Sequence, residues 1–110
     1  MDSKFSYRFS QRATDDLNDI VSYIAGNLSN QKAASDFVDT LQAAIDDLRA
    51  FPESSPHVSN EYLPDMDIRK KSVDNYILYY LPDYTEKVIL ILRIIYGRRN
   101  MDEIIRQLNI

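Results

Sequence analysis

The stretch Lys87-Val-Ile-Leu-Ile-Leu-Arg-Ile-Ile-Tyr-Gly-Arg-Arg99 decides the fold of this chain. From Val88 to Tyr96 it carries a single charge, Arg93, among residues that are largely β-branched. An apolar run of this length without polar alternation is typical of a strand that is covered on both faces. The run ends at a glycine, and Arg98 and Arg99 follow directly. The sequence therefore predicts a central strand with two cations at its end.

Alternation of side chains along this strand places Arg93 on one face together with three isoleucines, Ile89, Ile91 and Ile95. Tyr96 then points to the opposite face. A charged residue on such a face either pairs with an aspartate of a covering element, extends to the edge of the sheet, or has a functional role. These alternatives for Arg93 stay open at the level of sequence.

Length and composition favour one folded domain. The 110 residues are enough for a single hydrophobic core, so we expect one domain over residues 1–110. A hydrophobic fraction of 45% argues against disorder. The chain has no cysteine, which excludes disulfides and thiolate-held metals. Its first residues lack the pattern of a secretion signal, and no apolar stretch reaches membrane-spanning length. We therefore expect a soluble, cytoplasmic protein without a membrane partner.

The net charge of −4 is unevenly distributed. Residues 1–60 carry nine acidic and five basic residues, whereas residues 61–110 carry eight of each. Binding to nucleic acid through overall charge needs an excess of positive charge, so the whole molecule does not support this class of partner. A local basic patch in the second half remains compatible with these counts.

The first half of the chain predicts a strand and two helices. Phe5–Phe9 alternates apolar and polar residues like a half-buried strand. Ser10 is suited to cap a helix over roughly Gln11–Leu28, and Ser29-Asn30 offers the cap of a second helix that ends near Pro52. The short polar link between them predicts an antiparallel hairpin. Both helices have an apolar stripe at helical spacing, formed by Leu17, Ile20, Val21, Ile24 and Leu28 and by Ala34, Phe37, Val38, Leu41, Ile45 and Leu48.

Two groups of residues invite a metal or catalytic interpretation. Aspartates gather on the expected outer helix faces, but such clusters usually solvate a helix surface, and we expect no metal site. The only histidine, His57, lies in a loop rich in serine and proline. It has no acidic or nucleophilic neighbour in sequence, so we expect an exposed side chain rather than a general base. The sequence indicates no cofactor.

Strand patterns dominate the second half. Ile68–Val73 and Tyr76–Leu81 flank the turn residues Asp74-Asn75 and predict a hairpin that leads to the central strand. Asn100 starts a capping-box pattern for a short last helix, with apolar residues at Met101, Ile104, Ile105 and Leu108. The whole pattern predicts an α+β fold: an N-terminal strand, a two-helix antiparallel hairpin, a three-stranded antiparallel meander and a short C-terminal helix.

Several segments together resemble the RelE/ParE superfamily of bacterial toxins, in order and spacing. They are Ala43–Glu53, Ile68-Arg69, Asp74–Tyr80 and Ile91–Asn100. The resemblance covers nearly the whole chain and implies a RelE/ParE-like fold. It also implies the toxin of a type II toxin–antitoxin module, which a small protein antitoxin neutralises in a hetero-oligomeric complex. A degenerate, non-toxic binding module of the same fold is a further alternative.

The superfamily has two kinds of target. RelE-like members cut mRNA in the ribosomal A site, which needs proton transfer and cations for the developing phosphorane charge. The resemblance then implies five catalytic candidates, Arg69, Arg93, Tyr96, Arg98 and Arg99. Two departures from that branch are visible: Ile77 follows the strand tyrosine where arginine is common, and no late tyrosine follows the two arginines.

ParE-like members inhibit DNA gyrase through a protein–protein contact and need no catalytic residues. The long hairpin, the acidic first half and the incomplete acid–base set favour this branch. In this case Arg98 and Arg99 are the expected target-binding residues, because they follow the last strand and should be exposed. For the tyrosines of the second strand, Tyr76 and Tyr80 share a face, and core packing is favoured over base stacking.

Overall fold

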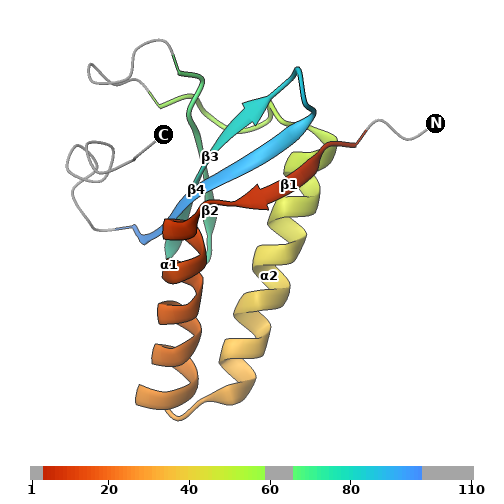
Figure 1. The fold of residues 1–110 in the computed structure, drawn as a ribbon. Helices are drawn as coiled ribbons and strands as arrows, with labels where there is room; N and C mark the ends of the chain where they lie inside the picture. The colour runs from red at the N-terminus through yellow and green to blue at the C-terminus, as the bar shows by residue number, and fades with distance from the viewer. Residues whose placement is uncertain (1–3, 59–65, 98–110) are drawn as a thin grey trace.

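The computed structural model describes residues 4–58 and 66–97. Strand β1 (Ser6–Phe9) leads into helix α1 (Gln11–Ser22), which continues as a π-helical turn, η1 (Tyr23–Asn27). Helix α2 (Gln31–Ala50) returns antiparallel to α1 (Figure 1). Strands β2 (Arg69–Val73), β3 (Tyr76–Asp83) and β4 (Val88–Tyr96) complete the described order. The predicted C-terminal helix lies outside the described residues.

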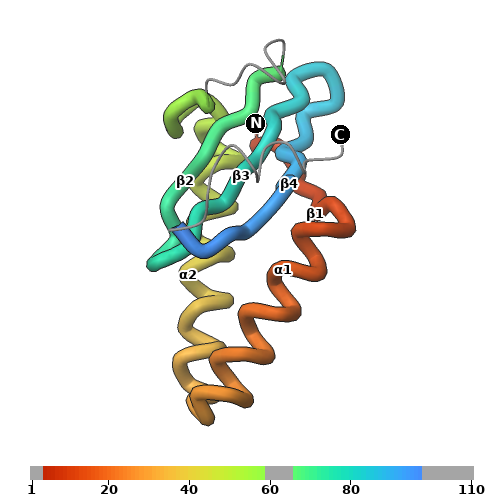
Figure 2. Tube along the Cα trace, turned by 90° about the vertical axis from the view of Figure 1, so that its left-hand side faces the viewer, coloured from red at the N-terminus to blue at the C-terminus, as the bar shows by residue number. Residues whose placement is uncertain are grey.

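The four strands form one sheet in the order β1-β4-β3-β2. β1 runs parallel to β4, and the other pairs are antiparallel. β4 is thus central, as its apolar sequence predicts, and the α+β fold is confirmed. In the ribbon and in the tube turned by 90°, the far end of the helical hairpin projects beyond the sheet (Figures 1 and 2). The sheet therefore does not cover that end of the hairpin.

Both predicted caps are present. The hydroxyl of Ser10 accepts a hydrogen bond from the amide of Ala13 at 3.0 Å, and the Asn30 side chain accepts one from Ala33 at 2.9 Å. These oxygens satisfy amides that a helix start leaves without partners. The Ser10 hydroxyl also donates to the Leu92 carbonyl of β4 at 2.8 Å, so the start of α1 is fixed to the central strand.

The sheet separates two apolar clusters. The larger one packs the helices against one face, with Leu41, Ile45 and Leu48 facing Leu78 and Tyr80. The smaller one lies on the other face, and its buried members are Val58, Ile68, Tyr79, Leu92 and Ile95. The central strand is therefore apolar on both faces because both faces are packed.

A β-bulge in β4 breaks the predicted alternation. Tyr79 lies opposite Arg93 whereas Tyr80 lies opposite Ile91, so β4 carries one extra residue, Leu92. An extra residue reverses the sides taken by the following side chains. Ile89 and Ile91 consequently pack in the helix-side cluster, while Ile95 packs in the other one. The prediction of one common face for these isoleucines is wrong for this reason.

The second half deviates from the sequence prediction at Pro82. β3 continues through this proline to Asp83, where the sequence predicts a connection. Pairing of β2 with β3 stops at Tyr80, so Pro82 has β4 on one side and no strand on the other. Proline is tolerated in a strand at such an unpaired edge.

Among the described residues, no helix is long and apolar enough to cross a membrane.

Candidate functional site

Arg93 is held by α1 rather than presented to solvent. Its Nε donates to Asp16 Oδ2 at 2.8 Å and its Nη2 donates to Asp16 Oδ1 at 3.0 Å, which is a bidentate ion pair. The same carboxylate accepts the backbone amide of Ile94 at 2.9 Å. Arg93 is 8% exposed, and its Nη1 is buried without a partner among the described residues. Of the alternatives open for Arg93, the structure shows the ion pair with the hairpin.

Arg69 is likewise engaged in internal contacts. Its Nε lies 3.1 Å from Asp67 Oδ1, and its Nη1 donates to the carbonyls of Glu53 and Ser55. Burial alone would lower the pKa of Arg69, but the hydrogen bond and charge of Asp67 outweigh this effect and raise it. The guanidinium thus fastens the loop after α2 to the start of β2. His57 belongs to this contact, with its Nε2 3.6 Å from Asp67 Oδ1 and its side chain half exposed, as expected.

The fold does not bring the described catalytic candidates together. Arg69 begins β2, and Tyr96 ends β4. Tyr96 lies opposite Tyr76 of β3, and Tyr76 lies opposite Val73 at the far end of β2. Along the strand direction, Arg69 is therefore four residues, or about 13 Å, away from the position of Tyr96. Arg98 and Arg99 lie outside the described residues, so their roles remain predictions. Within the described part, no group of three or more histidine or acidic residues is arranged to hold a metal ion.

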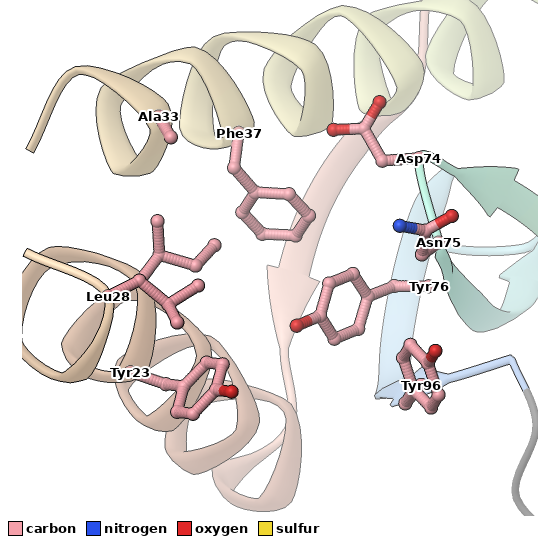
Figure 3. A pocket seen from close by; sticks show the side chains of 9 residues that line it. Tyr23, Leu28, Ala33, Phe37, Asp74, Asn75, Tyr76 and Tyr96 are labelled. Carbon is pink, nitrogen blue, oxygen red and sulfur yellow. The ribbon is translucent and has the colours of Figure 1, made fainter. Parts of the chain in front are cut away.

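A groove of about 350 Å³ opens where the hairpin passes the end of the sheet (Figure 3). We call it the aromatic groove, and its lining residues are Tyr23, Ile24, Leu28, Ala33, Phe37, Asp74, Asn75, Tyr76 and Tyr96. The helices contribute one wall, through η1 and the start of α2. The β2–β3 turn and the ends of β3 and β4 contribute the other. The groove exists because the hairpin is longer than the sheet that it covers.

Aromatic rings form the floor and rim of the groove. The ring of Tyr76 meets Phe37 edge to face at a centroid distance of 5.2 Å and Tyr96 at 5.8 Å. These contacts hold the central ring in place and favour a preformed shape. At the rim, Leu28 is 55% exposed, Tyr23 49% and Tyr96 45%. Exposed apolar side chains that gather in one place mark an interaction surface.

The charged groups around the groove are acidic. Asp74 lines it directly, and Asp16 and Asp19 line an adjoining hollow of 200 Å³ that shares Tyr76 and Tyr96 with it. Burial raises the pKa of Tyr76, and the electrostatic interactions with Tyr23 and Tyr96 raise this pKa further. Tyr76 therefore stays neutral at physiological pH. The site combines aromatic rings with carboxylates and, within the described residues, no cation lines either hollow.

Sequence reasoning missed this groove. The sequence favours core packing for Tyr76 and Tyr80, and the helix-side cluster does contain Tyr80 with Tyr76 packed against it. Yet Tyr76 is only partly buried and also faces the groove. The available signal was the length of the two helices, whose apolar stripes continue to Leu28 and back from Ala34. A stripe longer than the sheet beneath it leaves apolar side chains uncovered.

Comparison with known proteins gives one family and several similar folds. Residues 7–101 match the family described as ParE toxin of type II toxin–antitoxin system, parDE. A search of curated proteins finds no match. Among solved structures, the chromosomal ParDE system from P. aeruginosa aligns at 18% identity and a TM-score of 0.66, covering 86% of this chain and 98% of that chain.

Two further solved structures share the fold. The toxin–antitoxin complex RelBE2 from Mycobacterium tuberculosis aligns at 19% identity and a TM-score of 0.58, over 84% of this chain and 98% of that chain. A mutant of the E. coli toxin RelE in its free state aligns at 13% identity and a TM-score of 0.57, over 96% of this chain and 94% of that chain. At these identities the alignments show a common fold and do not separate the ParE and RelE branches.

Proposed function

The chain belongs to the ParE toxin family of type II toxin–antitoxin systems, and we propose that it inhibits DNA gyrase through a protein–protein contact. We further propose that a cognate antitoxin protein neutralises it in a hetero-oligomeric complex. Gyrase acts on the bacterial chromosome, so the proposal places the protein in the cytoplasm. No catalytic step is required of the chain in this account.

The observation that carries the proposal is the engagement of Arg69 and Arg93. Ribosome-dependent cleavage of mRNA needs cations that face the scissile phosphate. Arg93 is buried in a bidentate pair with Asp16, and Arg69 is bound by Asp67 and two backbone carbonyls. Freeing either guanidinium would leave a carboxylate without its partner. These two candidates therefore support the fold rather than a nuclease site.

The surroundings of Tyr96 also favour a protein target over RNA. Its ring packs edge to face on Tyr76, and the adjoining hollow is lined by Asp16, which is paired with Arg93, and by Asp19, which has no ion-pair partner among the described residues. Negative charge at this place opposes the approach of a phosphate backbone. An apolar rim beside it fits a protein surface. This geometry supports a binding role for the end of β4.

Arg98 and Arg99 are the proposed gyrase-contact residues. They follow Tyr96 and Gly97 directly in sequence. The double variant Arg98→Ala/Arg99→Ala should lose most of its growth arrest on induction while keeping its helical circular-dichroism spectrum. The matched control is Lys70→Ala/Lys71→Ala, which removes two adjacent cations from β2 and should leave toxicity intact. Full toxicity of the arginine variant would remove these residues from the account.

Pulse induction in bacteria tests the choice of target. Incorporation of thymidine and methionine is followed over the first minutes after induction. We expect DNA synthesis to fall before protein synthesis. An earlier fall in methionine incorporation would favour the RelE-like alternative, with Arg69, Arg93, Tyr96, Arg98 and Arg99 as catalytic candidates. Normal growth with folded protein accumulating would favour a degenerate binding module.

A further inference from the structure

We propose that the aromatic groove receives a basic, apolar segment of the antitoxin and holds one lysine or arginine side chain of that segment between aromatic rings and carboxylates. This inference rests on the proposed function, since it specifies where the antitoxin binds and by what chemistry.

The walls of the groove expose apolar surface to solvent. Tyr23 and Leu28 of the hairpin and Tyr96 of β4 face one another across the groove, with about half of each side chain in contact with solvent. Figure 3 shows Phe37 and Tyr76 pointing into the space between these walls. A volume of about 350 Å³ lies within the usual range of ligand pockets. The surface is thus shaped for insertion of side chains from a partner.

Three aromatic rings of the groove pack on one another. Phe37, Tyr76 and Tyr96 form a chain of edge-to-face contacts, at centroid distances of 5.2 and 5.8 Å. Such packing fixes the rings before a ligand arrives. A cation over the face of a ring, within about 6 Å of its centroid, is attracted by the ring quadrupole. Tyr96 and Tyr23 line the groove and are each about half exposed, so a lysine or arginine side chain that enters can reach them.

The groove and the adjoining hollow each contain an aspartate without an ion pair among the described residues. Asp74 in the groove and Asp19 in the adjoining hollow have no ion-pair partner within residues 4–58 and 66–97. Asp74 adopts a left-handed backbone conformation, with φ of 54°, in the turn that borders the groove. Residues 1–60, which include the hairpin, carry a net charge of −4. Charge complementarity therefore selects a basic segment over an acidic one.

The test begins with selection of short displayed peptides on the immobilised full-length chain. The strongest binder is then made synthetically and titrated by calorimetry. We expect enriched peptides with apolar residues at helical spacing and at least one lysine or arginine. Replacing this cation by norleucine, which keeps the aliphatic stem, should weaken binding about tenfold. Enrichment of acidic or uncharged peptides, or no enrichment at all, would contradict the inference.

Matched variants locate the binding. Tyr96→Leu and Asp74→Asn should each weaken the binding of the basic peptide. They should also reduce the difference in affinity between this peptide and its norleucine version. The controls are Tyr84→Leu and Asp39→Asn. Tyr84 is 47% exposed but packs on Phe5, outside the groove, and Asp39 points away from the face of α2 that carries Phe37. Equal effects of both sets would overturn the assignment of the groove.

Two further measurements test other occupants of the groove. Competition by a synthetic peptide of residues 98–110 would assign the groove to the chain's own end. Self-association that Tyr96→Leu abolishes, measured by sedimentation, would assign it to a second copy. Either result would overturn the antitoxin inference. Growth arrest on induction reports the proposed function separately: arrest without basic-peptide binding refutes the groove inference alone, and binding without arrest refutes the toxic activity alone.

Discussion

At the scale of single residues, the pair between Arg93 and Asp16 joins the first helix to the central strand. Asp16 satisfies two guanidinium nitrogens and the amide of Ile94. Ile94 lies beyond the end of β1, so β4 is paired there with β3 on one side and with no strand on the other. One carboxylate therefore closes the edge of the sheet and neutralises the buried cation. Sequence alternation alone predicts a charge at this place but does not identify its partner, since the two residues are 77 positions apart.

We predict that Asp16→Asn lowers the free energy of unfolding by about 3 kcal/mol, because it leaves a buried guanidinium without a counter-charge. Chemical denaturation with urea measures this loss. The control is Asp36→Asn, which breaks an exposed ion pair with Lys32. The Lys32 side chain is 84% exposed and the Asp36 side chain 60%. It should cost less than about 0.5 kcal/mol. Similar small losses for both variants would contradict a structural role for the Arg93 pair.

The buried tyrosines predict an alkaline limit to stability. Burial raises the pKa of Tyr79 and of Tyr80 above the ordinary value near 10. The unfolded chain then releases these protons at lower pH than the folded protein does. Below about pH 10 these two tyrosines should not make the free energy of unfolding depend on pH. As the pH rises further, the free energy of unfolding should fall.

Tyr80→Phe tests this limit. The variant should lose about 1 kcal/mol at neutral pH, because the Pro52 carbonyl loses the hydroxyl that donates to it at 2.9 Å. Above pH 10 its stability should decline less steeply than that of the parent chain. Urea titrations at a series of pH values measure both effects. An unchanged alkaline slope would show that Tyr80 does not contribute.

At the scale of elements, the start of α1 is more important to the fold than the start of α2. Ser10 caps its helix and also donates to Leu92, the extra residue of the bulge in β4. Asn30 caps its helix only. We predict that Ser10→Ala costs about 2 kcal/mol and Asn30→Ala about 1 kcal/mol, since two hydrogen bonds are lost in the first case and one in the second. Thermal unfolding of both variants measures the order, and a larger loss for Asn30→Ala would contradict it.

The elements themselves were largely predictable from the sequence, and their irregularities were not. Apolar stripes and caps located both helices, and the run from Val88 to Tyr96 identified the central strand. The bulge at Leu92 leaves no mark on a run in which nearly every residue is apolar, so the alternation after it was assigned wrongly. The groove was missed because it depends on how far the hairpin extends beyond the sheet, which is a property of packing rather than of any one segment.

At the scale of the whole molecule, charge and shape favour one kind of partner. The first sixty residues carry the net charge of −4, and the exposed aromatic rim lies where the hairpin meets the end of the sheet. Two of the five catalytic candidates are engaged in ion pairs, and the fold holds Arg69 far from Tyr96. These features support a protein that acts by binding other proteins.

The central claim, inhibition of gyrase by contact, is tested most directly with purified components. The chain, released from its antitoxin and refolded, is added to gyrase and relaxed plasmid, and in parallel to ribosomes translating a defined mRNA. The account predicts loss of supercoiling, recovery of supercoiling on addition of the antitoxin, and intact mRNA. Unimpaired supercoiling at a large molar excess of the chain, together with cleavage of the mRNA in the ribosomal A site, would contradict it.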